Sequence, residues 1–191
     1  MSSLPDVSWP LRTERLSIRP SEESDAAAFH GYRSDPEVSY WLPRLTTDLA
    51  AVEERFSGEE FRSKTLMVEH DGSVVGDLYL SLSDTWAQAE VADQAPQQAE
   101  IGWALGSAYQ GRGLAIEAVR RLVDCCFGEL GLHRVYAICF ADNVGSWRLM
   151  ERLGMRREAH TLKDSLHRER GWADGYTYAL LAEEWPTATR A

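Results

Sequence analysis

Hydrophobic and polar positions change their spacing along the chain, and each spacing predicts an element. Residues 13–19 alternate polar and apolar, which predicts a strand with one buried face that ends at Pro20. Residues 26–32 follow two serines and three acidic residues, and this order predicts a helix whose N-cap is Ser21 or Ser24. A second helix is predicted to begin at Thr46 or Thr47 and to end near Arg62.

The middle of the chain predicts a hairpin, a connection and a strand. Residues 65–69 and 74–82 are strand candidates joined by Asp71-Gly72, a pair typical of tight hairpin turns. Residues 83–98 are polar and predict a long connection, after which residues 99–105 predict another strand.

Strands and helices alternate in the second half. Apolar residues recur at helical spacing over residues 114–127, residues 133–140 predict a strand, and residues 143–154 predict a third helix that stops at a glycine. Two further strand candidates, residues 155–162 and 176–181, are separated by a charged stretch. This order predicts one α/β (α+β) domain around a mixed, mostly antiparallel sheet flanked by helices.

Length and composition agree with one folded domain. The chain has 191 residues, of which 44% are hydrophobic and 10% aromatic, enough for a sizeable core and against wholesale disorder. We expect a polar leader over residues 1–10, the domain over residues 11–185 and a short tail over residues 186–191.

Charge and cysteines narrow the classes of partner and location. A formal net charge of −10 disfavours nucleic-acid and anionic-membrane partners, and it either favours a cationic or amine-bearing partner or only maintains solubility. The three cysteines form no metal-binding or disulfide pattern. Neither a signal peptide nor an apolar run long enough to span a bilayer is present, so we expect a soluble cytoplasmic protein without a bound metal.

Residues 110–115 carry the first candidate chemistry. Gly111 and Gly113 stand where the predicted strand passes into the predicted helix, and glycines permit backbone conformations and close ligand approach that a Cβ obstructs. N–H groups at a helix N-terminus bind phosphate or pyrophosphate. Arg112 either adds a cation or lies in solvent, and a plain structural turn is the alternative interpretation of the whole stretch.

Three stretches together resemble the GCN5-related N-acetyltransferase (GNAT) superfamily. They are Glu-Ile-Gly-Trp from residue 100, Gln-Gly-Arg-Gly-Leu-Ala from residue 110, and the thirteen residues from Asn143 to Met155. The sequence is most similar to the RimJ/RimL-type branch, which acetylates ribosomal-protein N-termini and includes relatives that act on other amines. The resemblance extends over about residues 11–185.

The resemblance implies acetyl-CoA as co-substrate. Its pyrophosphate would bind the glycine turn, and its pantetheine arm would fill a gap where the strand of Glu100 and the strand of residues 133–140 splay apart. Backbone groups near residues 101–105 would bond to the arm. The residues implied to contact acetyl-CoA are Ile101, Gly102, Trp103, Ala104, Leu105, Gln110, Gly111, Arg112, Gly113, Leu114, Ala115, Asn143 and Ser146.

The implied reaction is direct attack of an amine on a thioester. Glu100 is the candidate base, directly or through water, because burial raises the pKa of a carboxylate; the alternative is an ordinary strand glutamate that pairs with an arginine or orients the substrate. Many members place a tyrosine as acid where this chain has Met150, so Ser146 is the candidate acid. Asn143 would bond the pantetheine amide or orient a water, and is equally suited to cap a helix.

Two functions therefore stay open. The first is an N-acetyltransferase whose acceptor is a protein N-terminus or an amine-bearing small molecule. The second is a non-catalytic acyl-CoA-binding module, favoured by the absent tyrosine. A nucleotide site is a poorer interpretation. The glycine turn matches neither the Gly-x-Gly-x-x-Gly pattern of a Rossmann fold nor the Gly-Lys-Ser/Thr ending of a P-loop. Relatives are often dimers, so a homodimer is compatible with the resemblance. Trp41, Trp86 and Trp103 are candidates to flank the acceptor, although Trp103 is also suited to the core.

Overall fold

The computed structural model describes residues 7–186, so the first six residues of the predicted leader and the last five of the predicted tail lie outside the described part. The chain divides into two compact units. The first unit contains the chain up to Leu80 together with Gly102–Leu122, and the second contains Ser81–Ile101 and the chain from Val123 onwards.

Four antiparallel strands begin the first unit. They follow one another as neighbours in chain order: β1 (Leu11–Arg12), β2 (Leu16–Pro20), β3 (Thr65–His70) and β4 (Ser73–Ser83), whose end enters the second unit. The predicted hairpin between β3 and β4 is confirmed, with φ angles of 50° at Asp71 and 75° at Gly72. Both angles are those of the tight turn that the dipeptide predicts.

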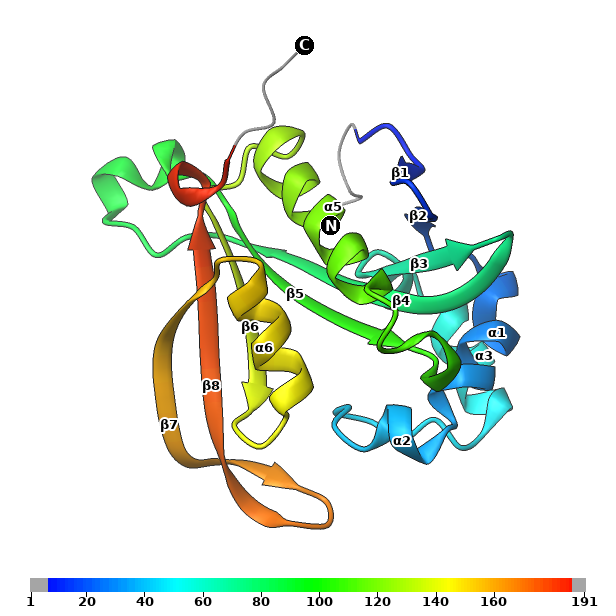
Figure 1. Ribbon diagram of the computed structural model, residues 1–191. Helices are drawn as coiled ribbons and strands as arrows, with labels where there is room; N and C mark the ends of the chain where they lie inside the picture. The colour runs from blue at the N-terminus through cyan, green and yellow to red at the C-terminus, as the bar shows by residue number, and fades with distance from the viewer. Residues whose placement is uncertain (1–6, 187–191) are drawn as a thin grey trace. The chain divides into compact units, whose positions relative to one another are not determined.

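Helices of the first unit pack around one aromatic core. They are α1 (Ala26–Arg33), α2 (Pro36–Ser39), α3 (Leu49–Ser57) and α4 (Glu59–Arg62). Helices α1 and α3 lie side by side (Figure 1), and between them Phe29 and Phe56 meet edge to face at 5.1 Å between ring centroids. Met67 of β3 belongs to the same core, which joins the helices to the sheet.

Two predicted helix boundaries are wrong. Neither Ser21 nor Ser24 caps α1. The Asp25 carboxylate accepts a hydrogen bond from the Glu22 N–H at 2.7 Å, and a short 3-10 turn, η1 (Glu23–Asp25), precedes the helix. The helix predicted over residues 46–62 is two helices. Gly58 separates them with an extended backbone, φ −78° and ψ 122°, and Asp48 rather than a threonine caps the first.

The second unit is built on β5 (Gln98–Leu105), β6 (Arg134–Phe140), β8 (Gly171–Leu181) and β7 (Arg156–His167), which are neighbours in that order. The first residues of β5 pair with β6 in parallel, and the other pairs of the unit are antiparallel. The predicted mixed, mostly antiparallel sheet with flanking helices is therefore confirmed.

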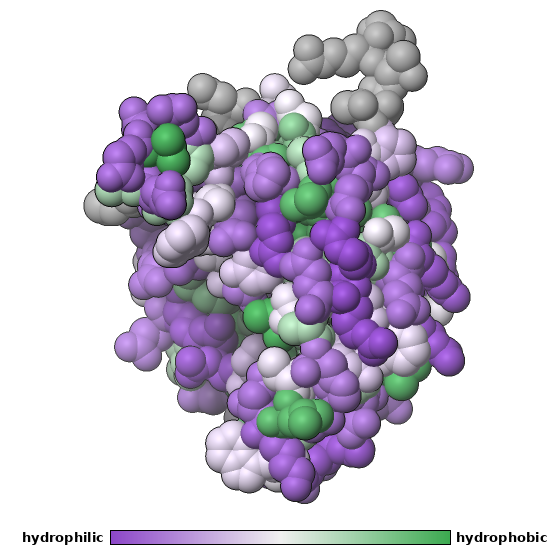
Figure 2. All heavy atoms as spheres, turned by 90° about the vertical axis from the view of Figure 1, so that its left-hand side faces the viewer, coloured by the Kyte–Doolittle hydropathy of each residue, from purple (hydrophilic) through white to green (hydrophobic). Residues whose placement is uncertain are grey.

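The charged stretch between the last two predicted strands is not a loop. Strands β7 and β8 extend through most of it as a long hairpin (Figure 1), with register shifts between Arg157 and Ala159 and again between Thr161 and Ser165. Charged side chains on an exposed hairpin obscure the two-residue period from which strands are predicted. Figure 2 shows hydrophilic side chains over most of the face it draws, with small separated apolar groups.

Helix α5 (Leu114–Gly128) follows β5 through the short turn η3 (Ser107–Tyr109), and α6 (Val144–Arg152) follows β6. Two further 3-10 turns, η2 (Ala89–Gln94) and η4 (Ala182–Glu184), lie in the second unit. Within residues 7–186, none of the helices has both the length and the apolar character that crossing a membrane requires.

Gly76 of β4 lies where β4 and the end of β5 approach each other closely in the first unit. A Cβ on Gly76 would lie 2.4 Å from the Ala104 carbonyl oxygen and 3.0 Å from the Leu105 Cα, both of which are backbone atoms. We expect Gly76→Ala to lower the free energy of unfolding by about 2 kcal/mol, since β4 or β5 must shift. Urea denaturation followed by circular dichroism measures this.

Gly31→Ala is the matched control. Gly31 lies in α1 with nothing within 4 Å of the added methyl group, so the substitution removes a flexible glycine from a helix without a clash. We expect it to raise the free energy of unfolding by about 0.5 kcal/mol. Equal effects of the two substitutions would contradict the close approach of the strands at Gly76.

Candidate functional site

The turn that joins η3 to α5 comprises residues 110–113 and contains two glycines. Gly111 and Gly113 have φ angles of 70° and 78°, values that disfavour any residue with a side chain. Both are exposed, whereas Leu114 is buried and anchors the start of the helix. The first N–H groups of an α-helix have no partner within it. The turn and the first turn of α5 therefore present donors, with the positive end of the helix dipole behind them.

Gln110 holds this turn from inside. Its backbone N–H donates to the Ser107 carbonyl at 3.2 Å, and its side-chain amide donates to the Leu105 carbonyl at 3.0 Å. Both of these Gln110 donors are therefore engaged within the protein. The Arg112 side chain is exposed and its guanidinium lies 5.7 Å from the centre of the Tyr109 ring.

Sequence reasoning missed a second support of the turn. Arg15 and Thr13, which lie just before β2, bind the Glu117 carboxylate in the first turn of α5. Arg15 also donates to the Arg112 carbonyl at 3.1 Å. These contacts join positions about one hundred residues apart, and no local pattern in the sequence indicates them.

Glu100 lies where pairing between β5 and β6 ends in the second unit. The parallel ladder comprises three pairs, the last of which is Glu100 with Tyr136. The carboxylate is half-buried, and burial raises its pKa above the usual glutamate range. Within residues 7–186 no hydrogen bond or ion pair engages this carboxylate, and it is the one carboxylic acid there whose pKa is raised.

One edge of β6 is open beyond that last pair. Within the second unit, residues 137–140 pair with β8 on one side, as far as Phe140 with Gly175, and have no strand on the other. Because backbone groups of an open strand edge need partners, this edge suits an extended ligand. The ladder between β5 and β6 therefore ends at Glu100.

Helix α6 begins with the two remaining candidates. The Asn143 side-chain oxygen accepts from the Ser146 N–H at 3.3 Å, so the capping role of Asn143 is confirmed. The cap uses the oxygen and leaves the Asn143 amide NH₂ for another partner. Ser146 is partly exposed, whereas Met150 is buried, and a thioether has no proton to give.

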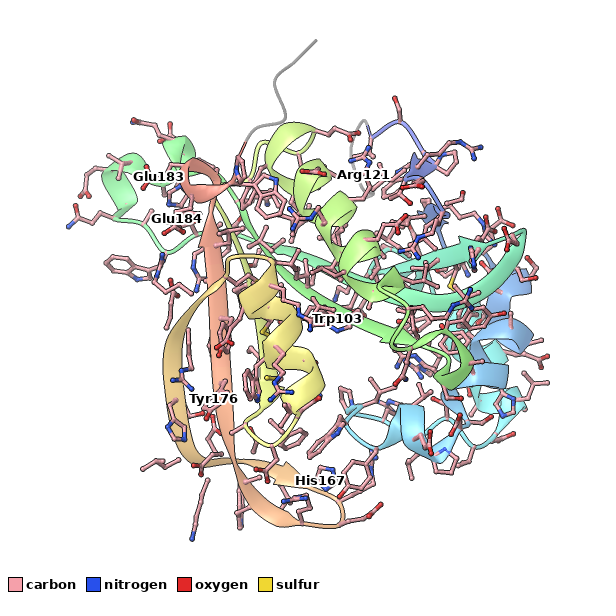
Figure 3. All side chains as sticks on the ribbon, in the orientation of Figure 1. Trp103, Arg121, His167, Tyr176, Glu183 and Glu184 are labelled. Carbon is pink, nitrogen blue, oxygen red and sulfur yellow. The ribbon has the colours of Figure 1, made fainter. Side chains whose placement is uncertain are left out.

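The aromatic side chains differ in their surroundings. Trp86 is 86% exposed, which excludes a core role, and Trp103 on β5 is only partly buried (Figure 3). Tyr176 on β8 lies against His160, 5.0 Å between ring centres (Figure 3). Tyr178 is buried and donates to the Glu151 carboxylate at 3.0 Å; burial and this bond raise its pKa to about 12.

The predicted residues thus form two groups, one in each unit. In the first unit, the contact between Gln110 and Leu105 brings the end of β5 and the glycine turn together, with Gly102, Trp103 and Ala104 preceding them on the strand. In the second unit, Glu100 ends the pairing of β5 with β6 and Ile101 follows it, whereas Asn143 caps α6 and Ser146 lies in its first turn. No group of three His, Cys, Asp or Glu side chains placed to hold a metal ion occurs among residues 7–186.

Comparison with known proteins identifies the family. Residues 15–156 match the family model described as an acetyltransferase (GNAT) domain. The chain is 30% identical to the uncharacterized N-acetyltransferase YnaD of Bacillus subtilis over 180 residues, which are 92% of this chain and 98% of YnaD.

Solved structures extend the likeness. A GNAT-family acetyltransferase from Bacillus anthracis is 31% identical, with a TM-score of 0.77 over 92% of this chain and 99% of its own. RimJ of Mycobacterium smegmatis, solved in complex with CoA-disulfide, is 26% identical, with a TM-score of 0.71 over 90% of this chain and 84% of its own.

The raised pKa of Glu100 predicts a pH-dependent gain in stability for Glu100→Gln. A carboxyl whose folded pKa lies above its unfolded pKa weakens folding once it ionises, so the penalty is absent below the unfolded pKa and grows as pH rises through the folded pKa. We expect Glu100→Gln to have the higher melting temperature at about pH 8, and no difference at about pH 4.

Glu158→Gln is the matched control of opposite sign. Hydrogen bonds from Arg134 and Arg156, at 2.6 and 2.8 Å, hold the pKa of Glu158 below its usual range, so its stabilisation is present at neutral pH and lost in acid. We expect this variant to melt earlier than wild type at about pH 8. A Glu100→Gln variant that also melts earlier would contradict the desolvated, unpaired state of Glu100.

Proposed function

The chain belongs to the GNAT family of acetyltransferases, and we propose that it transfers the acetyl group of acetyl-CoA to a primary amine. The observation that carries this proposal is Glu100: a half-buried carboxylate with a raised pKa and no partner in the described chain, placed where the pairing of β5 and β6 ends. A desolvated carboxylate without a partner does not stabilise the folded protein, and such groups cluster at functional sites.

The glycine turn supports binding of acetyl-CoA. Positive φ angles at Gly111 and Gly113, exposed N–H groups and the N-terminus of the 15-residue helix α5 suit a pyrophosphate. The open edge of β6 suits the pantetheine arm, which carries amides that pair with backbone groups. RimJ, a relative solved with CoA-disulfide, supports the same assignment. When bound, acetyl-CoA supplies an acetyl group activated as a thioester.

Glu100 is the proposed base. A primary amine is largely protonated at neutral pH and attacks only after losing a proton. Burial raises the pKa of this carboxylate, so it is a stronger base than an ordinary glutamate. Glu100 accepts the proton directly or through one water.

Ser146 is the proposed acid. Its hydroxyl has no hydrogen-bond partner within residues 7–186, so its proton is available to the departing sulfur. Asn143 places Ser146 through the helix cap and keeps its own NH₂ group free to bond a pantetheine carbonyl. The buried thioether of Met150 excludes this residue as the proton source.

The acceptor that fits this chemistry is an amine-bearing small molecule or a protein N-terminus. A net charge of −10 favours the approach of a cation, and every acceptor of this class carries one before it is deprotonated. The charge does not distinguish a peptide end from a small amine. Initial rates with a panel of amines and N-terminal peptides identify the acceptor.

Glu100→Gln tests the base. We expect kcat/KM for the acceptor to fall about 100-fold at neutral pH, because the amide cannot take a proton. In wild type the rate should rise with pH through the pKa of Glu100, and the variant should lack this rise. Thiol release is followed from about pH 5 to about pH 9, with Glu158→Gln as a control of equal charge change. Wild-type turnover by Glu100→Gln across this range would remove Glu100 from the chemistry.

Ser146→Ala tests the acid separately. We expect kcat to fall about 10-fold or more while the affinity for CoA, measured by calorimetry, stays within about two-fold of wild type. The alanine keeps the backbone N–H that Asn143 caps, so the helix start is preserved. Unchanged kcat would show that water supplies the proton.

A further inference from the structure

We propose that Arg15 is a positioning residue for acetyl-CoA: it directs the Gly113 N–H toward the pyrophosphate and neutralises Glu117 beside it. The inference rests on the proposed function, because it assumes that the glycine turn binds a pyrophosphate. It concerns a residue outside the turn that the reaction does not use directly. Arg15, Thr13, Arg112, Gly113 and Glu117 all belong to the first unit.

The guanidinium of Arg15 uses all three of its nitrogens at the base of the turn. Nε donates to Glu117 Oε2 at 2.7 Å, and Nη2 lies 2.5 Å from the same oxygen. Nη1 donates to the Arg112 carbonyl at 3.1 Å. A planar fork of fixed donors thus links a carboxylate on α5 to a peptide of the turn, a geometry that a lysine cannot reproduce.

The bond to the Arg112 carbonyl fixes one particular N–H. Arg112 and Gly113 share a peptide plane, and in a trans peptide the carbonyl of one residue and the N–H of the next point in opposite directions. Arg15 holds the carbonyl on its own side, so the Gly113 N–H points away from Arg15. Glycines on both sides of Arg112, at φ 70° and 78°, leave this plane free to rotate without such a contact.

The carboxylate of Glu117 explains why the residue at position 15 must be a cation. A carboxylate in the first turn of a helix is favoured by the helix dipole, but it also repels an anion bound at that end. Several donors are directed at it: Thr13 Oγ1 and the Arg15 N–H donate to Oε1 at 2.5 and 3.0 Å, and Nε of the guanidinium donates to Oε2. Burial raises the pKa of Glu117, but these bonds outweigh burial and hold the pKa below its usual range.

The backbone of Arg15 is itself held in place. Leu16 donates its N–H to Thr13 Oγ1 at 2.9 Å, which closes a tight turn just before β2. The Arg15 carbonyl lies 3.1 Å from Nδ1 of His70 at the end of β3. Arg15 therefore projects from a fixed platform, as a residue that orients another group requires.

Arg15→Gln with two acetyl donors tests the proposal. With acetyl-CoA we expect kcat/KM for the donor to fall about 10-fold, through KM and with kcat nearly unchanged, since a charge-assisted bond is lost and Glu117 is uncompensated. With S-acetylpantetheine, which has no pyrophosphate, we expect the variant to equal wild type. Calorimetry should show the same roughly 10-fold loss in affinity for CoA.

Three further variants separate positioning from stability. Arg15→Lys keeps the charge without the fork, and we expect a loss of about three-fold with acetyl-CoA. Arg12→Gln makes the same charge change at an exposed position of β1, and it should leave kcat/KM unchanged with both acetyl donors. Arg19→Gln breaks a bidentate ion pair with the buried Asp25; it should lower the melting temperature without distinguishing the two donors.

The outcomes distinguish this inference from the proposed function. Equal losses with both donors, or none, while wild type binds and uses acetyl-CoA, would overturn the positioning role of Arg15 alone. A wild-type protein that neither binds CoA nor releases thiol would overturn the proposed function and the inference with it. A loss confined to acetyl-CoA supports both.

Discussion

Backbone N–H groups at the start of α5 have no partner within the helix, and the surrounding chain is built to support them without covering them. Two glycines give the turn its path, and Gln110 ties it to the end of β5 from inside. Arg15 holds it from the side of β2. Gln110 and Arg15 each bind a carbonyl oxygen, of Leu105 and Arg112 respectively, and so do not use the N–H groups of the turn that an anion requires.

The second unit has a comparable unsatisfied feature in β6. Where β5 pairing ends at Glu100, one edge of β6 is left open, and the acid at that point is half-buried without a partner. Folding alone does not favour an open edge or an unpaired acid, since each costs free energy that pairing would recover. Features that weaken the fold and suit one reaction are typical of functional sites.

Elements decided by local geometry could be predicted from the sequence. The hairpin at Asp71 and the cap at Asn143 depend on neighbouring residues alone, and both are confirmed. The long charged hairpin of β7 and β8 was not predictable, because its side chains hide the strand period. The contact of Arg15 with Glu117 was not predictable either, since 102 positions separate them. The motifs indicated Glu100, but its lack of a partner depends on the tertiary structure.

That separation makes the order of synthesis relevant to the glycine turn. Thr13 and Arg15 leave the ribosome early, whereas Glu117 follows about a hundred residues later. Helix α5 and the glycine turn depend on local interactions. The contact of Arg15 with Glu117 requires closure of the chain between them, which has the higher entropic cost and is therefore slower. The turn is therefore among the last parts of the first unit to become fully organised, and its support depends on a segment far away in the chain.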